Sequence, residues 1–165
     1  MIEYPFDTAR AILSILTSGA LTKFPNIRFI FSHNGGAFPF LADRCRALDQ
    51  TIMAKNSGRN LRDLLEESNI FFDTALSFPV QWALVKGLGF SSSQLVHATD
   101  FPYTAGDSGA AALGAISTEM SGEFTDKEIN EDIAYKNAIS NFFPRLKREW
   151  EKAFGKEIFR EKAQL

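Results

Sequence analysis

Apolar residues recur along this chain with two different spacings. Near the start they follow the i, i+3, i+4, i+7 spacing that predicts a helix with one buried face. These positions are Ala9, Ile12, Leu13 and Leu16. We expect Asp7 to cap this helix and Gly19 to end it. Three other runs are short and apolar at almost every position, which is typical of strands covered on both faces of a parallel sheet: 27–31, 70–73 and 95–99.

Each of these runs precedes a segment with helical spacing. The first is followed by a helix from about residue 39 and the second by a helix over 78–88. After the third, the segment 125–128 has the Thr-x-x-Glu form of a capping box, opening a helix with Ile129 and Ile133 on one face. Three strand-then-helix units predict an α/β fold with a parallel sheet.

Three strands are few for such a sheet, because parallel strands that are apolar on both faces need neighbours at both edges. The chain also begins with a helix that no strand precedes. We therefore expect residues 1–165 to form a single domain that is the later part of a larger architecture.

Composition narrows the range of partners and locations. The hydrophobic fraction of 45% is enough for an ordinary core, and the dispersed charges with a net value of -2 argue against nucleic acid as a partner. The single Cys45 cannot form an intrachain disulfide, and no apolar run is long enough for a membrane span. No secretion signal is recognisable, so we expect a cytoplasmic location.

Two titratable residues come directly after predicted strands. His33 follows the first strand and Asp100 the third, and the carboxyl ends of parallel strands form the edge where such folds bind ligands. We therefore predict that both side chains face one pocket, with Gly35 and Gly36 allowing a sharp turn and leaving room for a substrate. Two alternatives stay open: the His33 ring could satisfy a loop carbonyl, and the Asp100 carboxylate could cap the turn that follows it.

Other residues near these strand ends are harder to assign. Asp73 could orient a substrate or accept hydrogen bonds from the next residue, and the sequence favours neither. His97 is out of phase with Asp100, so we expect it to pack against the helical layer. Cys45 is expected to be a small core residue. Phe38 and Phe40 are candidates for a flat aromatic pocket wall.

Three segments together resemble a known family: FPNIRFIFSHNGGAFPFLADR, FFDTALS and HATDFPY. They are similar, in order and at compatible distances, to the metal-dependent amidohydrolase-related decarboxylases. This group contains aminocarboxymuconate semialdehyde decarboxylase, resorcylate decarboxylase and 6-methylsalicylate decarboxylase, and the fungal methylsalicylate type resembles the chain most. The likeness extends over roughly residues 3 to 143.

The resemblance implies a distorted (β/α)8 barrel, of which this chain would be the last three strand-helix units. It also implies one divalent metal ion, zinc or else manganese, and a small aromatic carboxylate substrate. By position, His33 resembles the catalytic histidine and Asp100 the metal-binding aspartate. Arg44 resembles an arginine that some members extend into a neighbouring subunit to hold a substrate carboxylate, although a solvated helix arginine is the alternative.

The family's remaining metal ligands have no counterpart here. Members carry a His-x-His pair and a further histidine in the part that precedes this segment, whereas zinc needs about three protein ligands. The metal site is therefore expected to be incomplete, with a homo-oligomer or a complementing amino-terminal half as partner. The chain is expected to be a decarboxylase by descent that is inactive alone, with two alternatives: a silent fragment acting as an interaction module, or a metal-dependent hydrolase.

Overall fold

The computed structural model describes residues 2–47, 63, 65, 69–76, 79–103 and 124–156. The elements with assigned bounds are, in order: α1 (Glu3–Thr17), α2 (Ala20–Lys23), β1 (Phe29–Phe31), the 3-10 turn η1 (His33–Gly35), α3 (Phe38–Ala47), β2 (Ile70–Asp73), α6 (Pro79–Gly87), the 3-10 turn η2 (Ser92–Gln94), β3 (Leu95–Val96), the π-helix η3 (Glu128–Lys136), α8 (Asn137–Phe142) and α9 (Pro144–Phe154). Within these ranges, no helix combines the length and the apolar character that crossing a membrane requires.

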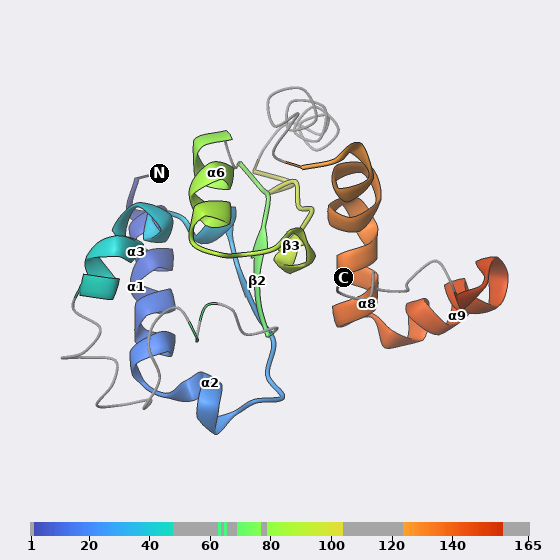
Figure 1. Cartoon of the computed structure of the whole chain (residues 1–165), viewed down its shortest axis with the longest axis horizontal. Helices are drawn as coiled ribbons and strands as arrows, with labels where there is room; N and C mark the ends of the chain where they lie inside the picture. Colours follow the sequence, from blue (N-terminus) through green and yellow to red (C-terminus); the bar gives the residue numbers. More distant parts are fainter. Residues whose placement is uncertain are drawn as a thin grey trace.

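The three strands form one parallel sheet in the order β1-β2-β3, as the sequence predicted. In Figure 1, α1, α3 and α6 lie on one side of β2 and the helices α8 and α9 lie on the other. The register aligns Phe31 with Phe72 and Phe72 with Leu95, and all three side chains are buried in the core with residues of α1 and α6. This aromatic and aliphatic row packs the sheet against α1 and α6.

The opposite face of the sheet is only partly covered. Phe71 is buried there and makes an edge-to-face contact with Phe142 of α8, with 4.8 Å between the ring centroids. Its register neighbour Ile30 in β1 is 46% exposed, and among the described residues β1 has a hydrogen-bonded neighbour strand only on the β2 side. The apolar face is therefore open at its β1 end.

Most predicted helices form, but with different ends. Helix α1 begins at Glu3, so the prediction that Asp7 caps it was wrong; Asp7 instead pairs with Arg10 one turn later. Pro5 is accommodated because its missing N–H would have no partner in the first turn. Gly19 follows the helix with a φ of 73°, the left-handed conformation expected after a helix end.

The predicted capping box is confirmed. The Thr125 N–H donates to Glu128 Oε2 at 2.8 Å, and the Glu128 N–H donates to Thr125 Oγ1 at 3.2 Å. Ile129 and Ile133 are fully buried on the helix that follows, as expected. That helix is a π-helix over its first nine residues, which the spacing did not predict. The predicted positions 48–62 lie outside the described residues.

Helix α1 packs directly against the turn that follows β1. The Ala37 N–H donates to the Pro5 carbonyl at 3.0 Å, and Gly36 lies under the same residue. A Cβ atom at Gly36 would be 2.5 Å from the Pro5 oxygen and 2.8 Å from its Cα. Because Gly36 also has a φ of 60°, this position needs glycine for both space and conformation.

We expect Gly36→Ala to lower the free energy of unfolding by about 2–4 kcal/mol, through a backbone clash and left-handed strain. Urea unfolding followed by circular dichroism measures this. The matched control is Gly87→Ala, where a Cβ meets nothing within 4 Å and helix propensity favours alanine by up to about 1 kcal/mol. Equal stabilities for the two variants would contradict the packing described for Gly36.

Candidate functional site

Unusual backbone conformations gather where the strands end. Four residues other than glycine have positive φ angles in the described part of the chain: His33, Asn34, Leu76 and Asp100. All four follow the carboxyl end of a strand. The left-handed conformation costs His33 and Leu76 about 1–2 kcal/mol relative to ordinary backbone, and it costs Asn34 and Asp100 less. Strained residues of this kind cluster at functional sites, which supports the prediction that the site lies at this edge.

Asn34 adds a second local cost. Its side chain is completely buried, and neither its Nδ2 nor its Oδ1 has a hydrogen-bond partner among the described residues. A buried amide without partners destabilises the folded chain. The turn that contains His33 is therefore not optimised for stability alone.

His33 is held at two points by the residues at the end of β2. Its backbone N–H donates to Asp73 Oδ1 at 2.8 Å, and its ring Nδ1 lies 2.9 Å from the Ala75 carbonyl oxygen. A carbonyl oxygen can only accept, so Nδ1 carries the proton. In the neutral ring Nε2 then keeps a lone pair, which is the form that can accept or relay a proton. The alternative role of His33, in which its ring satisfies a loop carbonyl, therefore holds for Nδ1. Nε2 is left available for a second role.

Further contacts hold the rest of the turn. Gln81 of α6 places its Nε2 3.4 Å from both the His33 and the Gly36 carbonyl oxygens. Sequence reasoning missed Gln81, because a glutamine on a helix surface carries no signal of what it will reach. The turn is thus fixed from three elements: α1, β2 and α6.

The predicted role of the two glycines was partly wrong. Gly35 and Gly36 do take positive φ angles, as a sharp turn requires. The space beside them, however, is filled by the protein itself: a Cβ at Gly35 would lie 3.0 Å from the Phe72 ring and 3.3 Å from Ile12. The glycines permit close packing of the turn on the core, and do not clear room for a substrate.

Asp73 resolves an ambiguity of the sequence. Its Oδ1 accepts the N–H groups of His33 and Ala75, the second at 3.1 Å, and Ser32 adds a side-chain hydrogen bond. Thr74, the expected donor, bonds elsewhere. Burial raises the pKa of the Asp73 carboxyl, and these hydrogen bonds offset only part of that effect.

His97 is tied to the neighbouring strand. Its Nδ1 lies 3.2 Å from Thr74 Oγ1, which also accepts the Ala98 N–H at 3.2 Å. Its backbone N–H donates to the Ile133 carbonyl of the π-helix at 3.0 Å. Burial lowers the pKa of the His97 imidazole, and the nearby Asp73 carboxylate raises it to a smaller extent. These contacts are those of a packing residue.

Asp100 has a free carboxylate within the described ranges. The turn after it is closed by its backbone carbonyl, which accepts the Tyr103 N–H at 2.8 Å, and by Thr99 Oγ1, which accepts the Phe101 N–H. No hydrogen bond or ion pair joins the carboxylate to another described residue. The alternative that this side chain caps the turn is therefore not what the structure contains.

Strict alternation along the strands does not place His33 and Asp100 together. The register aligns Phe31 with Phe72 of β2 and Phe72 with Leu95 of β3, so Phe31 and Leu95 share a face and Val96 belongs to the other one. Alternation stops before both candidate residues, because each has a left-handed backbone. Their convergence on one pocket stays a prediction.

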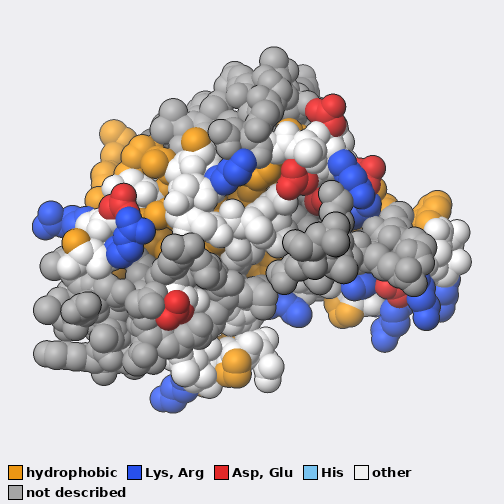
Figure 2. Space-filling model, in the orientation of Figure 1, with side chains coloured by type: hydrophobic (Ala, Val, Ile, Leu, Met, Phe, Trp, Pro, Cys, Tyr) orange, Lys and Arg blue, Asp and Glu red, His pale blue; other side chains and the backbone are white. Residues whose placement is uncertain are grey.

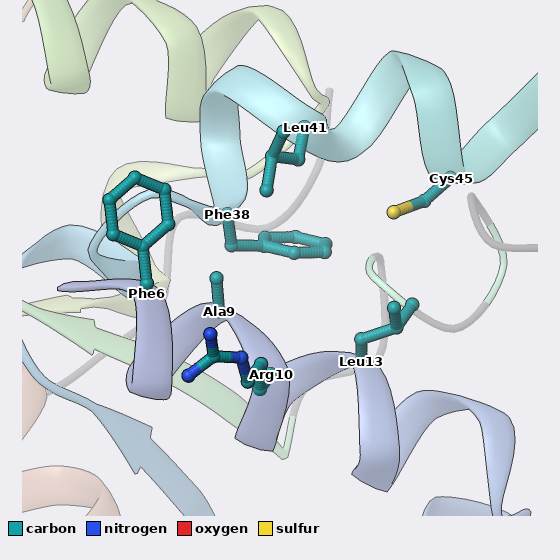
Figure 3. Close-up of a pocket in the computed structure, with 7 residues that line it drawn as sticks. All are labelled: Phe6, Ala9, Arg10, Leu13, Phe38, Leu41 and Cys45. Carbon is teal, nitrogen blue, oxygen red and sulfur yellow. The ribbon is translucent and has the colours of Figure 1, made fainter. Parts of the chain in front are cut away.

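The other predicted residues lie on α3. Phe38 is 1% exposed, and its ring lies between α1 and α3 beside the Cys45 sulfur, where both line an apolar pocket (Figure 3). Burial raises the pKa of the Cys45 thiol, as suits a largely apolar setting. Phe40 is 60% exposed, and Arg44 is exposed without a hydrogen bond or ion pair to other described residues. The substrate contacts predicted for Phe38 and Arg44 stay predictions.

The described residues do not form a metal site by themselves. No three His, Cys, Asp or Glu side chains among them are close enough together to hold an ion. Asp100 supplies one suitable oxygen ligand, whereas a zinc site needs about three protein ligands.

The chain resembles known proteins along most of its length. A model of the amidohydrolase family matches residues 4–143. The chain is 30% identical over 155 residues to a 6-methylsalicylic acid decarboxylase from Penicillium expansum, covering 93% of this chain and 46% of that protein. It is 28% identical over 146 residues to a 2-amino-3-carboxymuconate-6-semialdehyde decarboxylase from Caenorhabditis elegans, covering 84% of this chain and 33% of that protein. The chain thus spans less than half the length of these relatives.

Solved structures share its fold. A 2,6-dihydroxybenzoate decarboxylase complexed with 2,6-dihydroxybenzoate aligns with a TM-score of 0.67 at 21% identity, covering 84% of this chain and 41% of that one. A 5-carboxyvanillate decarboxylase from Novosphingobium aromaticivorans, complexed with manganese and 4-hydroxy-3-methoxy-5-nitrobenzoic acid, aligns with a TM-score of 0.65 at 17% identity, covering 84% and 39%.

The lowered pKa of His97 predicts a pH dependence of stability. Below its ordinary value of 6.5, the unfolded chain binds a proton at His97 more readily than the folded chain does, so stability falls as the pH falls. We expect the free energy of unfolding of the wild type, minus that of His97→Gln, to be smaller at pH 5 than at pH 7.5. Urea unfolding at both pH values measures this difference. A difference independent of pH would contradict the burial of the imidazole.

Proposed function

Because the chain belongs to the amidohydrolase family, as three segments of its sequence predicted, we propose that it is the carboxy-terminal part of a metal-dependent nonoxidative decarboxylase. The proposed substrate is a small aromatic carboxylic acid such as 6-methylsalicylate. One observation carries the proposal: His33, at the end of β1, is held by Ala75 with Nδ1 bonded and Nε2 available. The similarity to the Penicillium decarboxylase supports the substrate class.

The proposed architecture is the last three strand-helix units of a (β/α)8 barrel. The parallel order β1-β2-β3 and the open β1 end of the sheet at Ile30 support it, because a closed barrel would cover such an edge. The partner would be an amino-terminal half or, for part of the site, a second copy of the chain.

The reaction replaces the carboxylate of the substrate by a proton. The bond between the ring carbon and the carboxylate breaks, its electron pair stays on the ring carbon, and carbon dioxide leaves. His33 Nε2 is the proposed atom that takes up a proton from solvent and passes it to that ring carbon, since Nδ1 is committed to Ala75. Arg44 is the proposed ligand of the substrate carboxylate, because a guanidinium can bind it with two parallel hydrogen bonds.

A divalent cation, zinc or manganese, is the proposed cofactor. When bound, such a cation would supply positive charge that stabilises the negative charge on the substrate oxygens. Asp100 is its proposed ligand in this chain. The described residues do not complete such a site, so the other ligands would come from outside them.

An interaction module without activity is the second candidate. The incomplete ligand set and the open β1 edge both suit a fragment that only pairs with another polypeptide. A metal-dependent hydrolase on the same scaffold differs from the decarboxylase in its product, so product analysis separates the two.

We expect a chimera to restore activity. The amino-terminal half of the Penicillium decarboxylase would be joined to this chain and supplied with zinc or manganese. Incubated with 6-methylsalicylate, it should release carbon dioxide and 3-methylphenol, both measurable by chromatography and gas analysis. His33→Ala in the chimera should lower kcat about 10²–10⁴-fold, the usual contribution of a general acid or base.

The isolated chain is the control and should form no product. A folded chimera that binds metal yet stays inactive would favour the interaction module. Cleavage of an ester or amide in place of carbon dioxide release would favour the hydrolase. Full activity of the His33→Ala chimera would remove the proposed role of that residue.

Arg44 allows a matched test on one helix. We expect Arg44→Ala in the chimera to reduce kcat/KM roughly 10–100-fold, because a charge-assisted bidentate contact is lost. The control is Arg46→Ala: Arg46 is exposed on the same helix and already paired with Asp43, so its removal should leave kcat/KM unchanged. Equal effects of the two substitutions would indicate a general effect on α3.

A further inference from the structure

We propose that Asp73 is a positioning residue for His33: its carboxylate fixes the turn in which the imidazole carries its proton on Nδ1 and keeps Nε2 available. This inference rests on the proposed function for its chemical meaning, because it states which ring atom would handle the proton. The contacts behind it are independent of any substrate. The sequence left the role of Asp73 open, and the hydrogen bond that joins it to His33 is made by the backbone N–H of His33 and not by the ring.

The first step is the geometry of the carboxylate. Asp73 Oδ1 accepts the His33 N–H at 2.8 Å and the Ala75 N–H at 3.1 Å, so one oxygen joins the loops that follow β1 and β2. Ser32, just before His33, adds its side-chain hydrogen bond to the same carboxyl group. The carboxylate therefore holds both the residue that bears the ring and the residue whose carbonyl accepts the hydrogen bond from the ring.

The second step is the ring itself. The Ala75 carbonyl accepts from His33 Nδ1 at 2.9 Å, which selects one of the two neutral tautomers. This bond depends on the relative position of two loops, since the acceptor lies 42 residues along the chain from the donor. Asp73 is the side chain that binds the backbone on both sides of that contact. Removing the Asp73 carboxylate should therefore weaken the hydrogen bond between the His33 ring and the Ala75 carbonyl, even where β1 and β2 stay paired.

The third step is a comparison of strengths. Gln81 also reaches this turn, with two contacts of 3.4 Å to backbone carbonyls, whereas the hydrogen bonds to Asp73 are shorter and involve a charged acceptor. Burial raises the pKa of the Asp73 carboxyl, which means that the charged form of this group is destabilised by loss of solvent. A residue retained for core stability alone would more simply be apolar at this position.

The test is the tautomeric state of His33 in the full 165-residue chain labelled with ¹⁵N. Long-range ¹H–¹⁵N correlation spectra at a pH where the ring is neutral distinguish a protonated nitrogen from one with a lone pair. The wild type should show protonated Nδ1 and unprotonated Nε2. Asp73→Val, which keeps a branched side chain at the strand end but has no acceptor, should lose this preference and shift both ring nitrogens toward intermediate values.

Asp73→Asn is the rescue variant, because its amide oxygen can still accept the two N–H groups; it should keep the wild-type tautomer. Asp43→Asn, at an exposed position of α3, is the matched surface control and should change nothing at His33. Asp73→Ala replaces the valine variant if that chain does not fold. A folded Val or Ala variant with the wild-type tautomer would overturn the proposal. Failure of both to fold would overturn it too, since Asp73 would then be a general structural residue.

The outcome is separable from that of the proposed function. Because the spectra need neither substrate nor metal, a shifted tautomer together with an inactive chimera would leave the positioning role standing and remove the decarboxylase assignment. An unchanged tautomer in the Val or Ala variant, together with an active chimera, would remove the positioning role of Asp73 and leave the decarboxylase assignment standing.

Discussion

A single carboxylate oxygen links the ends of two neighbouring strands in this protein. Asp73 closes β2 and binds the first residue of the turn that follows β1, so the sheet and the candidate site are fixed by the same side chain. The turn is then covered by α1 through Pro5 and supported by α6 through Gln81. The left-handed residues in it are retained only because these elements hold them from several sides.

The order of the elements was predictable because each strand is a short apolar run with helical spacing behind it. The boundaries were less so. The third strand was expected to reach residue 99 but ends at Val96, because His97 and Ala98 donate their N–H groups to Ile133 and to the Thr74 side chain, where a ladder would use backbone carbonyls of β2. Such partners come from distant segments, and local pattern carries no trace of them.

The candidate site was predictable to the level of strand ends. That parallel strands bring their carboxyl ends to one edge was enough to select His33 and Asp100. The hydrogen-bond partner of the His33 ring could not be predicted, because a backbone carbonyl such as that of Ala75 has no sequence signature. Nor could alternation predict the direction of either side chain, because the backbone reverses its handedness at both residues. The neighbouring glycines were recognised as a turn, but what fills the space beside them depends on the tertiary packing of Pro5, Ile12 and Phe72.

Charged and hydrophobic side chains are unevenly distributed over the surface of the molecule. Figure 2 shows Lys and Arg side chains gathered at the end where α9 lies, a helix without buried residues, while hydrophobic side chains are visible elsewhere on the same face. A second surface feature is the edge of β1: among the described residues, this strand is hydrogen-bonded only on the β2 side. Unpaired backbone N–H and C=O groups at the edge of a sheet can form hydrogen bonds with an extended segment of another chain, including an unfolded one. For the isolated 165-residue chain, abundance in a cell would then depend on how readily chaperones and proteases act on this strand edge, as well as on equilibrium stability.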